Sequence, residues 1–74
     1  MGKSAYAAVL YREGDGYVAV CPELDVASQG PTIEEARANL REAVELFLET
    51  ASPQEIRERR HSEVYVTSLE VGVG

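Results

Sequence analysis

The sequence is short of the residue types that small domains use for covalent or metal cross-links. It contains one cysteine and one histidine in 74 residues, so neither a disulfide within the chain nor a cysteine-rich zinc site can form. A folded chain of this size hides only ~60% of the surface that its unfolded form exposes. We therefore expect one domain over residues 1–74, whose stability depends on close packing or on association with other chains.

Basic residues and long apolar runs are also scarce. The chain has 7 Lys and Arg against 13 Asp and Glu, for a formal net charge of -6. Clustered cations drive sequence-independent binding to nucleic acid, so this charge favours a basic or neutral protein partner instead. No apolar run approaches the ~20 residues that span a bilayer, and the first residues lack the apolar core of a signal peptide. We expect a cytoplasmic protein with no membrane contact.

The first half of the chain has the pattern of three short strands. The expected strands are residues 4–12, 17–21 and 26–29, and the turns between them are residues 13–16 and 22–25. The turn at 13–16 contains two glycines and an aspartate, which supply the positive φ angles of a hairpin turn. Pro22 cannot donate to a strand ladder and therefore marks the end of the second strand.

A helix follows, and a last strand is expected after it. Thr32 is the expected N-cap, and Glu35 completes a capping box. Apolar residues then recur at helical spacing through Ile33, Ala36, Leu40, Ala43, Val44, Phe47 and Leu48. Residues 54–61 read as a charged helical or turn-like connection, and 63–71 as a β-branched fourth strand. The predicted fold is a two-layer α+β domain of order β-β-β-α-β, with an antiparallel-rich sheet and one main helix on one face.

The geometry of this fold leaves part of the sheet uncovered. One helix is ~10 Å wide, whereas four strands at ~4.8 Å spacing make a wider sheet. The first and last expected strands carry apolar side chains on both faces, which a solvated face should not. We therefore expect a homo-oligomer, dimer or tetramer, or a sheet covered by a partner.

No reactive group has the neighbours that catalysis needs, so we predict no catalytic, cofactor-binding or metal-binding residues. His61 lies in a polar connection without a second histidine, and Cys21 ends an apolar strand, where it packs as a small hydrophobe. Asp15 at a turn is explained by turn chemistry. The predicted partner contacts are four strand tyrosines and two turn acids: Tyr6, Tyr11, Tyr17, Tyr65, Glu23 and Asp25.

An ordered series of short motifs resembles the HicB-like antitoxin family over roughly residues 4–50. The motifs are 13–19 (EGDGYVA), 21–24 (CPEL), 27–30 (ASQG), 32–36 (TIEEA) and 39–43 (NLREA). They coincide with the turn, strand-end and capping positions derived above. The resemblance therefore concerns the fold and supplies no catalytic constellation.

The resemblance implies a fold similar to a cut-down ribonuclease H domain without its active-site acids. It also implies binding to a small basic toxin that has a double-stranded-RNA-binding-like fold and cleaves mRNA with a histidine. Members of the family usually add a helix-turn-helix or ribbon-helix-helix segment that binds operator DNA. The pattern here ends with the fourth expected strand, so we expect no direct DNA binding.

Three functional readings follow. The leading one is a non-enzymatic, antitoxin-like interaction module that oligomerises and masks a basic ribonuclease toxin. The second is a metal-dependent nuclease relic that would use Asp15, Asp25 or Glu35. The third is a purely structural homo-oligomer or a binder of a small ligand.

Overall fold

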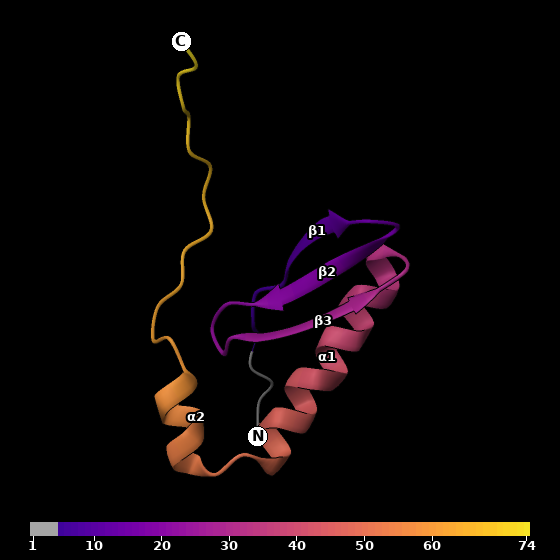
Figure 1. Cartoon of the computed structure of the whole chain (residues 1–74). Coiled ribbons are helices and arrows are strands. Elements are labelled where there is room, and N and C mark those ends of the chain that lie inside the picture. The colour runs from indigo at the N-terminus through magenta and orange to yellow at the C-terminus, as the bar shows by residue number, and fades with distance from the viewer. Residues whose placement is uncertain (1–4) are drawn as a thin grey trace.

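The computed structural model describes residues 5–74 and confirms the α+β class. Its elements in chain order are β1 (Val9–Glu13), β2 (Gly16–Cys21), β3 (Val26–Gly30), α1 (Ile33–Thr50) and α2 (Pro53–Arg59). The strands form one antiparallel sheet in the order β1-β2-β3, and α1 packs against one face of it (Figure 1). Neither helix within residues 5–74 has the length and apolar character that a bilayer crossing needs.

The first two strands form the expected hairpin. Glu13 pairs with Gly16, which leaves a two-residue turn of Gly14 and Asp15. Gly14 has a φ of 60°, and a glycine with positive φ at the first central position is typical of the type II′ turn, whose twist matches that of the strands. The sequence signal therefore fixes the register of this pair.

β1 begins later than the sequence pattern predicts. The expected strand covered residues 4–12; Ser4 lies outside the described residues, and the ladder starts at Val9, which pairs with Val20. β2 ends at Cys21 because Pro22 follows it and has no amide for the ladder. In this register Ala8 lies opposite Cys21, the last residue of β2, and the chain before Ala8 has no β2 residue opposite it.

The core lies between α1 and the sheet. Thr32 caps the helix as expected, since its side chain accepts the amide of Glu35 at 3.0 Å. The buried core consists of one stripe of α1 and the side chains that it covers: Ala36, Leu40, Val44, Ala19, Cys21 and Leu24. Ile33, which the helical spacing also placed on this stripe, is 48% exposed.

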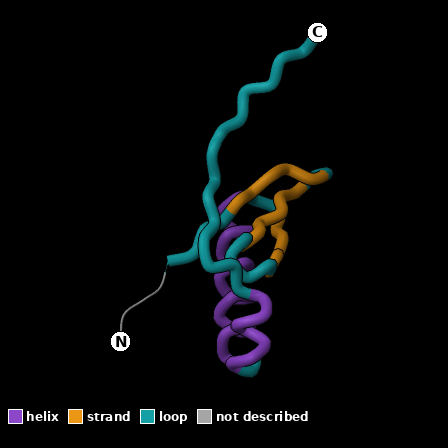
Figure 2. Tube along the Cα trace, turned by 90° about the vertical axis from the view of Figure 1, so that its left-hand side faces the viewer, coloured by secondary structure: helices purple, strands orange, loops and turns teal. Residues whose placement is uncertain are grey.

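The expected fourth strand does not form. α2 occupies the connection that was expected to be helical or turn-like, but the chain after Arg60 contains no helix or strand. It runs away from the domain as an extended segment (Figures 1 and 2). Residues 63–71 have β propensity, but propensity alone does not make a strand without a neighbouring ladder. The β-β-β-α-β order is therefore corrected to β-β-β-α-α within the described chain.

Candidate protein-interaction surface

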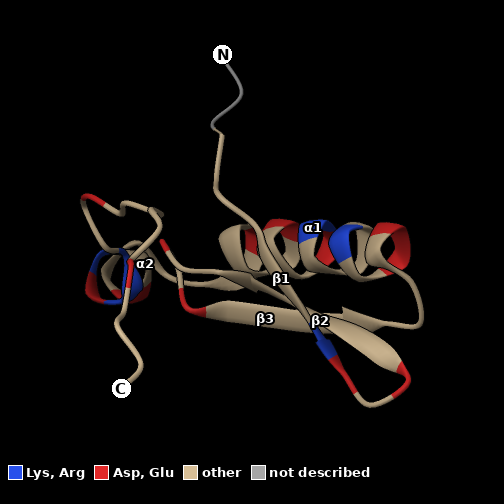
Figure 3. Ribbon diagram, turned by 90° about the horizontal axis from the view of Figure 1, so that it is seen from above, with Lys and Arg blue, Asp and Glu red and all other residues tan. Residues whose placement is uncertain are grey.

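One face of the sheet carries an apolar surface that no helix covers. Ala19 and Cys21 on β2 are fully buried toward α1. Side chains alternate along a strand, so Val18 and Val20 point to the opposite face. Figure 3 shows α1 along one side of the sheet and no helix over the other.

The register extends this surface across all three strands. Directly opposed residues of an antiparallel pair lie on the same face. Val20 is flanked by Val9 on β1 and Ala27 on β3, and Val18 by Tyr11 on β1 and Gln29 on β3. We call the apolar members of these two rows the open face: Val9, Tyr11, Val18, Val20 and Ala27.

The open face is accessible to a partner. Val9 is 37% and Tyr11 48% exposed, and Ala27 on the far strand is also exposed. A solvated sheet face ordinarily alternates with polar residues, and contiguous exposed apolar groups mark interaction sites. The sheet is therefore incompletely covered, as expected, although it has three strands instead of four.

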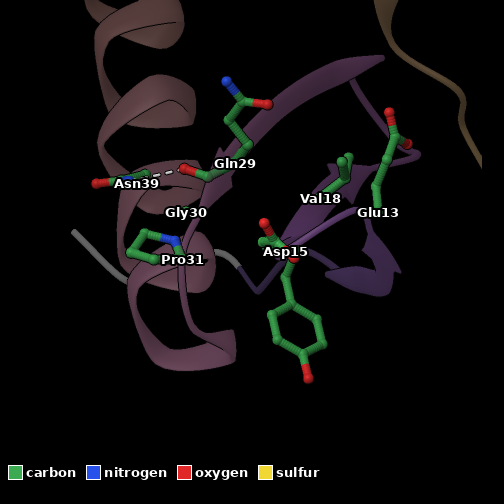
Figure 4. Close-up of a pocket in the computed structure, with 9 residues that line it drawn as sticks. Glu13, Asp15, Val18, Gln29, Gly30, Pro31 and Asn39 are labelled. Carbon is green, nitrogen blue, oxygen red and sulfur yellow. Dashed lines mark hydrogen bonds between the residues drawn. The ribbon is translucent and has the colours of Figure 1, made fainter.

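A shallow recess of about 590 Å³ lies where the hairpin turn meets the start of α1 (Figure 4). Its rim includes the carboxylates of Glu13 and Asp15, and the Asn39 side-chain amide donates to the main-chain oxygen of Gln29 at 2.8 Å. All four of these residues are exposed. The recess is thus an acidic, solvated border next to the open face, without the buried polar groups of an enclosed ligand site.

The four tyrosines predicted as contacts do not form one surface. Tyr11 lies on the open face. Tyr17, which pairs with Arg12, lies on the helix side, partly buried against the core with the Arg12 guanidinium 5.6 Å from its ring centre. Tyr6 also packs against the core. Tyr65 follows α2, is 81% exposed, and donates to a Glu63 carboxylate oxygen at 3.2 Å. Among them, Tyr11 and Tyr65 are exposed, and Tyr6 and Tyr17 are partly buried.

Glu23, a predicted acidic contact, lies in the turn between β2 and β3 and accepts hydrogen bonds from three other residues of this chain. Its two carboxylate oxygens accept the Ala7 amide at 3.1 and 2.9 Å, and one of them accepts the Cys21 thiol at 3.5 Å. Burial raises the pKa of Glu23, but hydrogen bonds from the amides of Ala7 and Glu23 and from the Cys21 thiol outweigh it, so the net pKa is below its usual value. The main-chain oxygen of Glu23 accepts the His61 amide at 2.8 Å.

Asp25, the second predicted acid, lies in the same turn and faces α2. Its backbone is left-handed, with a φ of 55°, which aspartate tolerates better than most residues. Its carboxylate lies 3.0 Å from His61 Nε2. The structure therefore brings Glu23 and Asp25 together, and both contact other parts of this chain.

The potential reactive groups do not converge. Cys21 is fully buried, and burial, together with the adjacent Glu23 carboxylate, raises the pKa of its thiol. Asp15 and Asp25 lie in turns at opposite ends of β2, and Glu35 is engaged with the N-cap Thr32. Within residues 5–74 no three His, Cys, Asp or Glu side chains are grouped as metal ligands.

Most of the open face was not predicted from the sequence. Val18, Val20 and Ala27 were not among the predicted contacts, although the alternation in residues 17–21 already separates Val18 and Val20 from Ala19 and Cys21. What the sequence could not supply was the β2–β3 register, which places Ala27 beside Val20. The sequence signal for the Glu23 contacts was its position as the acid directly after Pro22, which ends the strand.

Comparisons with known proteins agree on one group of relatives. UPF0150 protein ssl0738 of Synechocystis sp. strain PCC 6803 is 50% identical over 38 residues, which are 50% of this chain and 53% of that protein. UPF0150 protein ssr1765 of the same strain is 49% identical over 47 residues, 61% of this chain and 60% of that protein. The chain is similar to UPF0150 proteins and matches somewhat more than half of their length. No family model matches the chain, and no solved structure matches it.

Proposed function

We propose that this chain is a non-enzymatic protein-interaction module of the HicB-like antitoxin kind, which associates with itself and neutralises a small basic ribonuclease toxin. The observation that carries the proposal is the open face. Its apolar rows lie across all three strands, and α1 covers the opposite side of the sheet. The motif series of residues 13–43 supports the family, and the similarity to UPF0150 proteins is compatible with it.

Charge supports a basic partner. The chain has a net charge of -6, and the acids Glu13 and Asp15 stand at the hairpin end of the open face. An apolar centre with an acidic border suits a basic protein that carries an apolar patch. Opposite charges mainly accelerate association, so the association rate with such a partner should fall as salt is added.

A non-enzymatic role is favoured over a nuclease relic. Metal-dependent cleavage needs carboxylates that converge on one ion, and Asp15 and Asp25 lie at opposite ends of β2. The Asp25 carboxylate instead lies 3.0 Å from His61 Nε2, and a Glu35 carboxylate oxygen accepts the Thr32 hydroxyl at 3.2 Å. If purified protein cleaved RNA with Mg²⁺, and Asp15→Asn or Asp25→Asn abolished this without loss of folding, the nuclease reading would replace ours.

The test takes as the binding partner any small basic protein that a reading frame beside this gene encodes. We expect it to co-purify with the chain and its RNA-cleaving activity to be inhibited. Val18→Glu puts a charge in the middle of the open face and should weaken binding by on the order of tenfold or more. Leu46→Glu is the matched control, because Leu46 is 61% exposed on α1, away from the sheet.

Two results would contradict the proposal. One is the absence of any small basic protein that binds the purified chain. The other is equal binding by the Val18→Glu and Leu46→Glu variants, which would place the partner away from the open face. Circular dichroism of both variants provides the check that the fold is retained.

A further inference from the structure

The segment after α2 is extended and has the composition of a strand, but it pairs with no other strand of the described chain. Residues 63–71, which we call the tail, are extended and outside any sheet. Most of their large side chains are open to solvent, with Tyr65 81%, Val66 68%, Leu69 86% and Val71 73% exposed, while Val64 is partly buried. Odd-numbered positions carry Tyr65, Leu69 and Val71, so one side of the tail is more apolar than the other. Such a segment is suited to pairing with the edge of a sheet.

The sheet offers an edge for such pairing at β1. In the order β1-β2-β3, β2 is central, and β1 has a neighbour on one side only. Alternate residues of β1 therefore direct their amides and carbonyls away from β2, toward solvent. Tyr11, Arg12 and Glu13 are exposed along this strand. This edge has no helix beside it, since α1 lies over β2 and β3.

The tail does not use the edge of its own domain. The chain just before the tail is held against the domain, because the His61 amide donates to the Glu23 main-chain oxygen at 2.8 Å. From there the tail leaves the sheet, and Figures 1 and 2 both show it running free of β1. Within the described residues, the tail and the outer edge of β1 are therefore each without a strand partner in the same molecule.

We propose that two copies of this chain exchange their tails, with each tail adding as a fourth strand to the β1 edge of the other copy. This specifies the mode of the self-association proposed above and rests on it. Two such contacts related by a twofold axis satisfy both tails and both edges, which closes the assembly as a dimer. The expected fourth strand is then formed in the partner instead of in its own domain.

Length and charge fit this exchange. Nine tail residues at ~3.3 Å per residue extend over about 30 Å, and β1 has 5 residues, so the tail is long enough to pair along the whole strand. The tail carries Glu63 and Glu70 and no base, and β1 carries the exposed Arg12 and Glu13, so Arg12 is the one cation on β1 that the acids of the tail can approach. The exchange leaves the open face free for a second partner, because edge pairing and face packing use different sides of the strand.

Proline substitutions in the full-length protein test the ladder directly. A strand at the edge of a sheet uses alternate amides for pairing, and proline removes the amide that it replaces. Among Val64→Pro, Tyr65→Pro, Val66→Pro and Thr67→Pro, we expect one parity to raise the dimer dissociation constant by about tenfold or more and the other to have a smaller effect. Val73→Pro, beyond the tail, is the control. Native mass and sedimentation give the dissociation constant.

Site-directed cross-linking distinguishes exchange from pairing within one chain. One copy carries Arg12→Cys, and a second, differently tagged copy carries Tyr65→Cys, Thr67→Cys or Leu69→Cys. The native Cys21 is buried, so it does not compete. Oxidation of the mixture should give a disulfide that joins the two differently tagged chains for at least one tail position, because neighbouring strands approach within disulfide range.

The outcomes separate this inference from the proposed function. A dimer that is insensitive to every tail proline but lost in Val18→Glu would be a face-to-face assembly, which overturns the exchange and keeps the self-association. A further variant carries Arg12→Cys and Leu69→Cys in the same chain. If this variant forms a disulfide only within one chain and the mixture of singly substituted copies forms none, the tail folds back on its own β1, which also overturns the exchange. If the protein is a monomer at all concentrations, both the exchange and the self-association are wrong. Binding to a basic partner is measured independently.

Discussion

Both carboxylate oxygens of Glu23 accept the main-chain amide of Ala7, at 3.1 and 2.9 Å. The ladder with β2 has already ended at this point, so the side chain supplies the acceptor that a neighbouring strand would otherwise provide. The main chain of the same residue accepts the His61 amide. One turn residue thereby holds both the segment that leads into β1 and the start of the tail.

The Glu23 contact predicts a pH dependence of stability. Its folded pKa is lowered relative to an unfolded value of about 4.3, so folding favours the ionised form. The stabilisation is complete above the unfolded pKa and is lost as the pH falls through the folded pKa. Thermal unfolding of the wild type should therefore lose more stability between about pH 5 and pH 3 than that of Glu23→Gln. The exposed Glu42→Gln variant should keep the wild-type slope, and equal slopes in all three proteins would refute the assignment.

The Cys21 thiol is predicted to be unreactive in the folded protein. It is fully buried, and burial beside the Glu23 carboxylate raises its pKa, which reduces the thiolate fraction that attacks disulfide reagents. We expect a thiol reagent at neutral pH to react in urea and to react in native buffer only through unfolding. A native reaction as fast as that in urea would show that Cys21 is accessible.

The two helix caps should differ in their effect on stability. Thr32 and Ser52 each accept a backbone amide three residues on, at 3.0 and 3.1 Å. Loss of an N-cap side chain costs about 1 kcal/mol where the helix is part of the folded core, so Thr32→Ala should lower the free energy of unfolding by about that much. α2 has no buried residues, and Ser52→Ala should have a clearly smaller effect. Urea titration followed by circular dichroism measures both, and a larger loss in Ser52→Ala would contradict this difference.

Gly30 is predicted to tolerate no side chain. A Cβ there would lie 2.6 Å from the amide nitrogen of Ala36 and 2.9 Å from the carbonyl carbon of Glu35, both parts of the backbone of α1. Such overpacking costs at least ~1–3 kcal/mol, so Gly30→Ala should lower the thermal midpoint strongly. Gly72→Ala, where nothing lies within 4 Å, is the control. If the two variants were equally stable, the close approach of β3 to α1 would be wrong.

Much of the domain could be predicted because its signals are local. The hairpin at Gly14, the strand end at Pro22 and the capping box at Thr32 each depend on a few neighbouring residues, and all three form as expected. Local turn and cap chemistry is sufficient for such features. The α+β class follows from them, since three turn-linked strands before an amphipathic helix leave few arrangements.

The features that escaped prediction depend on partners distant in sequence. Tail residues 63–71 have the composition of a strand, yet a strand exists only beside another strand, and composition does not say where that neighbour is. Likewise Tyr11 and Tyr17 look equivalent in the sequence, and only the register with β2 puts them on opposite faces. The predicted contact roles of Tyr6, Tyr11, Tyr17, Tyr65, Glu23 and Asp25 stay predictions.

The consecutive order β1-β2-β3, with α1 following directly, has a kinetic consequence. Each strand pairs with its sequence neighbour, so the closure of long loops does not limit the formation of the domain. Folding should be a rapid first-order reaction that is complete while the tail is still free. Any step that places the tail on another molecule is second-order, and its rate should rise with protein concentration while the folding rate stays constant.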